Sequence, residues 1–280
     1  MLRNPFCITI ILALGLLSGG ATLCAQNEVS LPAVAATSIF AQFPDNDFGS
    51  TTLVAGTNAN YNPARALFSF DLSSIPAGAT ITQVSVGITE TQHPDPDQHG
   101  GPVDSNFDLY PLLVPWGQGS GAGKDGAPAE AGDATWNSNQ LGLASWSTPG
   151  GQAGVDYASN PVTTTFVSGL GFYVWGSTED FVAAAQGWLD DPSTNFGLIM
   201  VSETEYTPGT GRRFGSIDSP GGSVAPPVLT VDYIVAPEPG TGLLLLIGIL
   251  ACANRSPRRG SSKRANLRCS LKVASHPEVC

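Results

Sequence analysis

The central part of the chain contains no cysteine. The five cysteines all lie near the two ends, at Cys7, Cys24, Cys252, Cys269 and Cys280. A domain between residues 26 and 235 therefore has no disulfide to restrict its unfolded state. We expect its stability to come from a hydrophobic core or from bound metal.

Basic residues are scarce in the same part of the chain. The whole sequence has 12 Lys and Arg against 23 Asp and Glu, yet the central part contains only Arg65, Lys124, Arg212 and Arg213. A surface with this balance repels nucleic acid and anionic lipid. The composition therefore argues against a role in binding DNA or RNA.

Catalytic signatures are also missing. The sequence has no Gly-x-Ser-x-Gly elbow, no His-Glu-x-x-His pair and no phosphate-binding loop, and the central histidines are only His93 and His99. A pair of carboxylates that hydrolyses glycosides stays open in principle, but no pair stands out among so many acids. We predict that the protein is not an enzyme.

The N-terminus has the pattern of a secretory leader. Arg3 precedes an apolar run at 6–17, and small residues follow up to a cleavage site after Ala25. This pattern predicts a signal peptide at 1–25 and an exported protein. A lipoprotein site at Cys24 is the alternative, but the bulky Leu23 stands where lipoprotein processing prefers Gly, Ala or Ser.

Strand periodicity dominates the next 200 residues. Apolar and polar side chains alternate over 65–71 and 83–89, and Ser73 to Ala79 form a Pro and Gly connection between the two runs. Further strands are expected at 107–113, 162–167, 171–175, 197–202 and 228–234. We predict an all-β domain at 26–235 with the fold of a jelly-roll-like β-sandwich.

One short helix is expected within this β-rich pattern. Ser177 or Thr178 can cap it, acidic residues follow in its first turn, and Pro192 ends it. Its apolar residues, which include Trp188, fall at helical spacing. We expect Trp188 to pack in the core and the helix to close one end of the sandwich.

Two long segments read as exposed loops, where binding function commonly resides. The first, at 93–105, contains a cluster of imidazole and carboxylate groups that is a candidate for a divalent ion: His93, Asp95, Asp97 and His99. The second lies at 117–132. Asp45, Asn46 and Asp47 are a separate candidate for calcium, with turn formation as the simpler alternative. Calcium is thus a candidate cofactor, and a solvated acidic loop is the alternative interpretation of the first cluster.

Tryptophan and arginine supply the remaining candidate ligand contacts. Trp116 and Trp146 are flanked by Gly, Ser and Pro, so their rings are candidates for stacking on sugars, whereas Trp136 is expected to pack. The arginines Arg65, Arg212 and Arg213 are candidates for pairing with the carboxylate of an acidic sugar. Internal ion pairs with Asp71 or Asp218 are the alternative.

Several short motifs in this part of the chain resemble a known domain family. They stand at 46–50 (Asn-Asp-Phe-Gly-Ser), 65–72 (Arg-Ala-Leu-Phe-Ser-Phe-Asp-Leu), 75–81, 135–137, 195–198, 214–216 and 227–233. In this order they resemble a DNRLRE-type domain, which is also described as a carbohydrate-binding module. The resemblance implies a β-sandwich fold, and it implies carbohydrate binding as a function.

The C-terminal part begins with a turn, continues with an apolar run and ends in a basic tail. Pro237, Glu238 and Pro239 precede the apolar residues up to 253, and Arg255, Arg258 and Arg259 follow. The apolar run is shorter than the roughly 20 residues of a spanning helix, so a transient membrane helix is expected. A plain membrane anchor is the alternative.

These C-terminal residues are similar to the PEP-CTERM sorting signal. The resemblance implies that 236–260 forms a sorting and membrane segment, that an exosortase-like membrane protease is a partner, and that the domain is delivered to the cell envelope or extracellular matrix. The basic tail at 261–280 has no counterpart in that pattern. We predict a non-catalytic exported protein of the cell surface or matrix, with recognition of an exopolysaccharide as the alternative function.

Overall fold

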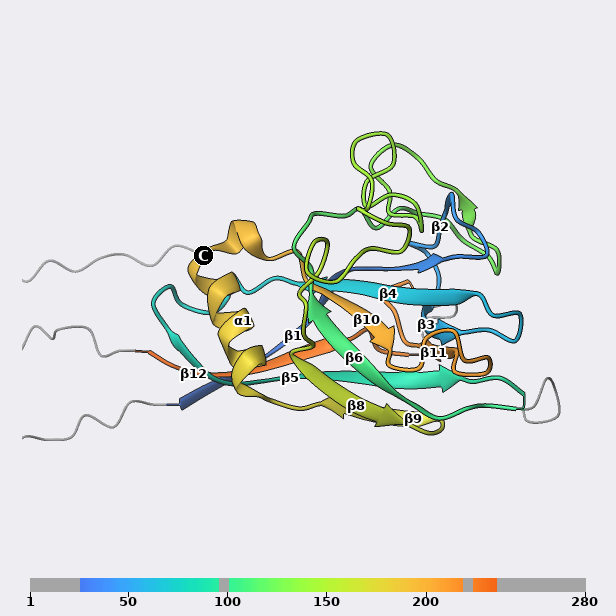
Figure 1. Ribbon diagram of the computed structural model, residues 1–280. Helices are drawn as coiled ribbons and strands as arrows, with labels where there is room; N and C mark the ends of the chain where they lie inside the picture. The colour runs from blue at the N-terminus through green and yellow to red at the C-terminus, as the bar shows by residue number, and fades with distance from the viewer. Residues whose placement is uncertain (1–25, 96–100, 219–223, 236–280) are drawn as a thin grey trace, which may run out of the picture. The chain divides into compact units, whose positions relative to one another are not determined.

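The computed structural model describes residues 26–95, 101–218 and 224–235 (Figure 1). Within them the chain is mostly β-sheet with a single α-helix, which is consistent with a β-sandwich. The strands are β1 (Gln26–Phe40), β2 (Asn46–Asp47), β3 (Leu53–Thr57), β4 (Pro63–Phe70), β5 (Thr80–Gln92), β6 (Ser105–Pro111), β7 (Ala127–Pro128), β8 (Thr163–Val167), β9 (Gly171–Trp175), β10 (Leu198–Ser202), β11 (Arg212–Phe214) and β12 (Val228–Ile234). The helix α1 (Glu179–Asp190) is followed by a 3-10 turn at Pro192–Thr194.

All pairs between the named strands are antiparallel, and β1 and β3 each divide their length between two partner strands. The first half of β1 pairs with β12, whereas its second half pairs with β4 after a register shift between Ala33 and Ala35. Similarly, β3 pairs with β11 and, at its end, with β4. The strand order is β1-β12-β5-β11-β3-β4-β10-β6-β8, with β9 on β5, while β2 and β7 form a separate pair.

The main hydrophobic core contains the residues that the period-two pattern predicted. Val84, Val86 and Ile88 of β5 are buried together with Phe68 and Phe70 of β4. The expected alternation over these two runs is therefore confirmed for the core-facing side. The expected strands at 171–175 and 228–234 have the observed bounds, and those at 162–167 and 197–202 differ by one residue at their starts.

The predicted helix is confirmed. Thr178 is its N-cap, and its hydroxyl accepts a hydrogen bond from the Phe181 amide at 3.0 Å, as a capping side chain should. Phe181, Ala185 and Trp188 are buried in the main core, so the expected packing role of Trp188 is confirmed. In Figure 1 the helix lies at the end of the domain where β12 also ends.

A second, smaller core covers the opposite side of β4. Leu67 is buried there although it alternates with the residues of the main core, so β4 is buried on both sides. The irregular chain between β6 and β8 provides much of this cover, and Figure 1 shows it looped above β4. The cluster consists of Ile39, Leu67, Leu112, Ala134, Trp136, Trp146, Tyr157 and Ile199.

The described residues contain no helix that is both long enough and apolar enough to cross a membrane. The predicted signal peptide at 1–25 and the predicted sorting and tail segments at 236–260 and 261–280 lie outside the described residues. The sorting-motif residues Pro237, Glu238, Pro239, Arg255, Arg258 and Arg259 lie there too.

Candidate functional site

A cleft of about 390 Å³ lies where five segments meet. These segments are the end of β1 with the residues after it, β3, the β3–β4 turn, the end of β5, and β11, and the loop at Lys124 completes the rim. The lining residues are Phe40, Gln42, Phe43, Val54, Gly56, Asn58, Ala59, Asn62, Ala64, Gln92, His93, Pro94, Lys124, Asp125, Gly211, Arg212 and Arg213. We call it the β3–β11 cleft.

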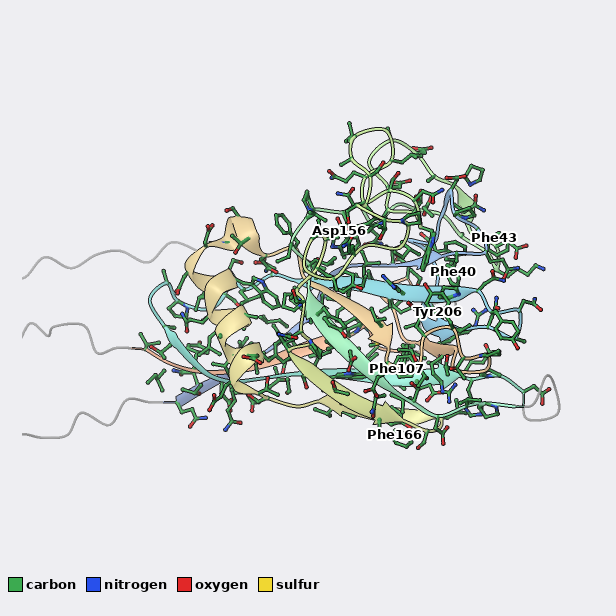
Figure 2. All side chains as sticks on the ribbon, in the orientation of Figure 1. Phe40, Phe43, Phe107, Asp156, Phe166 and Tyr206 are labelled. Atoms are coloured by element: carbon green, nitrogen blue, oxygen red, sulfur yellow. The ribbon has the colours of Figure 1, made fainter. Side chains whose placement is uncertain are left out.

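Aromatic rings form one side of the β3–β11 cleft. Phe40 and Phe43 line it, and Figure 2 shows both near the chain that follows β1. Buried Phe48 holds these rings, because its centroid lies 4.1 Å from that of Phe40 and 6.1 Å from that of Phe43. The packing fixes an apolar surface against which the face of a sugar ring can stack.

Side-chain amides stand beside these rings. The Asn58 Nδ2 donates to Gln42 Oε1 at 2.7 Å, which ties the β3–β4 turn to the chain after β1. The side-chain amides of Asn62 and Gln92 form no hydrogen bond with any described residue. Amide groups of this kind donate to and accept from sugar hydroxyls.

The β3–β11 cleft gathers most of the domain's cations. Four Lys and Arg occur in the described residues, and Lys124, Arg212 and Arg213 all line this one cleft. Lys124 Nζ lies 3.6 Å from Asp125 Oδ2 in a highly exposed pair. Arg213 is exposed, and among the described residues its guanidinium makes one long hydrogen bond, of 3.4 Å to Thr52 Oγ1. Arg213 is therefore the cation best placed to meet an anionic ligand.

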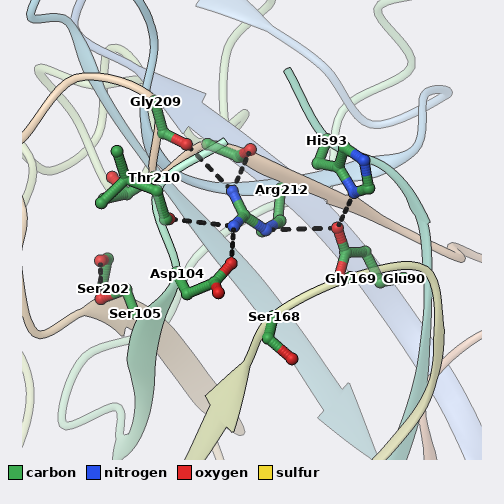
Figure 3. Close-up of polar contacts among 12 residues, drawn as sticks. Glu90, His93, Asp104, Ser105, Ser168, Gly169, Ser202, Gly209, Thr210 and Arg212 are labelled. Atoms are coloured by element: carbon green, nitrogen blue, oxygen red, sulfur yellow. Dashed lines mark hydrogen bonds and ion pairs between the residues drawn. The ribbon is translucent and has the colours of Figure 1, made fainter. Parts of the chain in front are cut away.

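Arg212, unlike the exposed Arg213 beside it, is buried and forms ion pairs. It is fully buried, with Nε 3.2 Å from Glu90 Oε1 and Nη2 3.3 Å from Asp104 Oδ1 (Figure 3). Its guanidinium also donates to the backbone carbonyls of Gly209, Gly211 and Val103. Buried in this way, Arg212 fixes the wall of the cleft. The predicted alternative of an internal ion pair is thus observed, but with Glu90 and Asp104 in place of Asp71 or Asp218.

His93 connects this buried network to the cleft. Its Nδ1 lies 3.3 Å from Glu90 Oε1 at the end of β5. Burial raises the pKa of Glu90, and the charges of Arg212 and His93 offset only part of that effect. The second oxygen of Glu90, Oε2, is buried without a hydrogen-bond partner among the described residues. His93 therefore takes part in a packed polar network.

Arg65 forms a second buried clamp, away from the lining of the β3–β11 cleft. Its Nε and Nη2 bind the two carboxylate oxygens of Glu205 at 2.8 and 2.6 Å. Its Nη1 donates to the carbonyls of Gly150 and Gly151 at 2.8 and 3.0 Å. Burial alone would lower the pKa of Arg65, but the hydrogen bond and charge of Glu205 outweigh it and raise that pKa. The ion-pair alternative holds for Arg65, with Glu205 as the partner instead of Asp71.

Asp71 and Asp218, the two predicted partners, have other contacts. Asp71 accepts hydrogen bonds from the amide and hydroxyl of Ser73 at 2.8 and 2.9 Å, which lowers the pKa of the carboxyl. Asp218 accepts from Gln118 Nε2 at 3.1 Å. Asp71 thus stabilises a local turn, whereas Asp218 contacts a residue 100 positions away in the chain.

The two tryptophans predicted to contact a ligand pack against the rest of the domain instead. Trp146 is only 4% exposed, and its Nε1 donates to the Thr135 carbonyl at 2.9 Å. Trp116 is half-buried against the second core, and its Nε1 donates to the Phe196 carbonyl at 2.8 Å. These positions do not support the idea that either ring stacks on a sugar. Trp136 is buried, so its expected packing role is confirmed.

The predicted calcium ligands at 45–47 already have hydrogen-bond partners in the protein. Asp47 is buried and its Oδ1 accepts hydrogen bonds from the backbone amides of Gly49 and Gly121. Asp45 Oδ1 accepts from Asn137 Nδ2 at 2.9 Å, and Asn46 Nδ2 donates to the Asp125 carbonyl at 2.9 Å. Asp47 and Asn46 thus tie the segment at 117–132, which was predicted to be an exposed loop, to the chain after β1.

The second metal cluster is only partly described. His93 and Asp95 lie within the described residues, with His93 engaged by Glu90 and Asp95 exposed. Asp97 and His99 lie outside the described residues. Among the residues that the structure describes, no three His, Cys, Asp or Glu side chains are grouped as a metal site. Calcium binding therefore stays a prediction.

Sequence patterns indicate Arg212, Arg213 and His93 but not the rest of the cleft. Phe40, Phe43, Asn62 and Gln92 lie on segments that are far apart in the chain, and no local motif joins them. The one available signal was the asparagine-rich stretch at 58–62, whose composition is typical of a tight turn. No model of a known protein family matches this chain, and no curated protein matches it.

Proposed function

We propose that the protein is a non-catalytic component of the cell surface or extracellular matrix, exported by its leader and sorted by an exosortase-like protease. Its described domain is proposed to be a jelly-roll-like β-sandwich. The observation that supports this role is the use of ionised side chains to hold loops, as Arg65, Asp47 and Arg212 do. Loops held in this way suit a domain that must stay folded outside the cell without disulfides.

The sorting part of this proposal predicts a change in processing when the motif is altered. A Glu238→Ala variant should remain at full size in the membrane fraction, because the C-terminal motif no longer directs cleavage and transfer. Wild type should accumulate as a shorter form in the envelope or medium. Western blots of cell, envelope and medium fractions measure both forms, and an Asp232→Ala variant in β12 serves as the matched control. Identical size and location of the Glu238→Ala and wild-type proteins would refute sorting at this motif.

Carbohydrate binding is the second candidate function, and the β3–β11 cleft is the observation that favours it. The cleft combines two phenylalanine rings, two side-chain amides without hydrogen bonds to any described residue, and an exposed arginine on an otherwise acidic domain. Rings stack on sugar faces, amides bind hydroxyls, and a guanidinium binds a carboxylate. We therefore propose an acidic exopolysaccharide, such as one that contains uronic acid, as the ligand.

This candidate predicts that Arg213 determines affinity for acidic sugars. An Arg213→Gln variant should bind oligogalacturonate about tenfold or more weakly than wild type, because one charge-assisted hydrogen bond contributes about 1.5–3 kcal/mol. Added salt should weaken binding of the wild type more than of the variant. Isothermal titration calorimetry measures both effects, with Glu179→Gln, an exposed charge at the start of α1 outside the cleft lining, as the control. Equal affinities of wild type and Arg213→Gln would exclude this role for the arginine.

A glycan array discriminates between the two candidates. The purified protein should bind to the acidic glycans on the array if the cleft is a binding site. A silent array would favour the purely structural role.

A further inference from the structure

Two tyrosines have an unusual backbone conformation. Tyr61 has φ of 63° and Tyr206 has φ of 76°, and they are the only residues other than glycine with positive φ in the described part of the chain. A bulky side chain in this left-handed region costs energy that glycine or asparagine avoids. Such strain persists where the surrounding structure enforces it, and it is concentrated at functional sites.

Both strained residues present their rings to solvent. The exposed fraction is 67% for Tyr61 and 61% for Tyr206, so the strain is not compensated by burial of an aromatic ring. Burial is the usual reason for retaining a large aromatic side chain in a folded domain. The exposure of these two rings therefore requires another explanation.

The turn that carries Tyr61 is fixed by its asparagines. Asn58 Oδ1 accepts from the amides of Asn60 and Asn62 at 2.9 and 3.1 Å, and the Tyr61 amide donates to the Asn58 carbonyl at 3.2 Å. Asn58 and Asn62, on either side of Tyr61, line the β3–β11 cleft. The exposed ring of Tyr61 thus belongs to a rigid turn at the rim of that cleft.

The loop that carries Tyr206 is fixed against the same place. The Tyr206 amide donates to Thr57 Oγ1 at 3.0 Å, and Thr57 is the residue directly before the Asn58 turn. On the other side, the neighbouring Glu205 is held by the guanidinium of Arg65 at 2.6 Å. Two rigid loops that touch at Thr57 therefore each present one strained and exposed tyrosine, and Figure 2 shows Tyr206 below Phe40.

We propose that Tyr61 and Tyr206 form an aromatic platform that binds sugar rings of a polysaccharide beyond the unit held in the β3–β11 cleft. This inference rests on the proposed carbohydrate binding of that cleft and extends it. The asparagine side chains beside Tyr61 offer hydrogen bonds to hydroxyls at the edge of a stacked ring. The ligand is therefore an extended chain, and its affinity depends on the number of its sugar units.

The test compares short and long forms of one probe. Calorimetry with the purified protein should show that galacturonate hexamer binds about tenfold or more tightly than dimer, because only the longer chain reaches the platform. Tyr61→Asn and Tyr206→Asn should weaken hexamer binding while dimer binding stays unchanged. Phe166→Ala removes a ring of similar exposure, 57%, on β8 outside both loops, and should change neither affinity.

Thermal unfolding supplies an independent readout. Because asparagine tolerates positive φ, Tyr61→Asn and Tyr206→Asn should keep or raise the Tm, by up to about 4 °C each. Weaker hexamer binding with an undiminished Tm supports the platform. Hexamer affinity that is unchanged in both variants overturns the platform alone, including the case in which the tyrosines serve a protein partner. Failure of the wild type to bind either probe overturns both the platform and the cleft.

Discussion

Replacing Arg65 by Met should lower the free energy of unfolding by about 3–5 kcal/mol, the loss expected when one partner of a buried ion pair is removed. The change leaves the Glu205 carboxylate, whose side chain is only 10% exposed, without its partner. It also leaves the carbonyls of Gly150 and Gly151 without their donor. The ring contacts of the guanidinium with Trp136 and Tyr157 disappear as well.

Chemical denaturation and thermal unfolding measure this loss. For a domain of this size the same free energy corresponds to a fall in Tm of roughly 6–20 °C. Arg213→Met is the matched control, because that arginine is exposed and should change the stability by less than about 0.5 kcal/mol. The double variant Arg65→Met with Glu205→Met should regain part of the stability, since no buried charge is then unpaired. A loss below about 1 kcal/mol for Arg65→Met would show that the pair behaves as a surface salt bridge.

Replacing Asp47 by Ala should lower the free energy of unfolding by about 3 kcal/mol or more. The carboxylate accepts hydrogen bonds from two backbone amides, those of Gly49 and Gly121, and each bond to a charged acceptor contributes about 1.5–3 kcal/mol. Gly121 also packs too closely against Asp47 to tolerate a Cβ atom, so the two segments meet without intervening side chains. Without the carboxylate, the segment at 117–132 should detach and become sensitive to protease.

Denaturant unfolding measures the stability loss, and limited proteolysis with mapping of the cleavage sites measures the release of that segment. Asp45→Ala is the control, because Asp45 is exposed and its side chain accepts one hydrogen bond, from Asn137. Adding calcium tests the competing interpretation of the same residues. A clear rise in the Tm of wild type with calcium, absent from Asp47→Ala, would mean that Asp47 serves as a metal ligand in solution.

The buried charged side chains of Arg65 and Asp47 explain why the domain holds long irregular segments without disulfides. Arg65 joins β4 to the glycines at 150 and 151 and to the loop at 205, and Asp47 joins the chain after β1 to the segment at 121. Each joins chain segments that are at least 74 residues apart in sequence. The proposed ligand site also depends on Arg65, since Arg65 holds Glu205 and Glu205 lies directly before Tyr206 of the proposed platform.

Local patterns of the sequence determined the secondary structure well. The alternation in β5 places Val84, Val86 and Ile88 in the core, and Thr178 and the apolar spacing after it define α1. These features are set by side-chain direction and by capping within a few residues of the chain. Short strands without clear alternation, such as β3 and β11, escaped prediction because they have few residues to show a period.

Only the tertiary structure decided which partners the polar side chains of these elements contact. Arg65 and Glu205 are 140 residues apart, and which carboxylate meets that arginine depends on strand order and not on spacing in the chain. The β3–β11 cleft likewise joins five segments whose aromatic, amide and cationic side chains carry no common motif. The sequence alone determined that the domain is β-rich, acidic and free of cysteine. Neighbouring side chains on a strand point to opposite faces. The pairing of distant strands decided which face of β11 is buried, so that Arg212 lies in the cleft wall while Arg213, the next residue, is exposed.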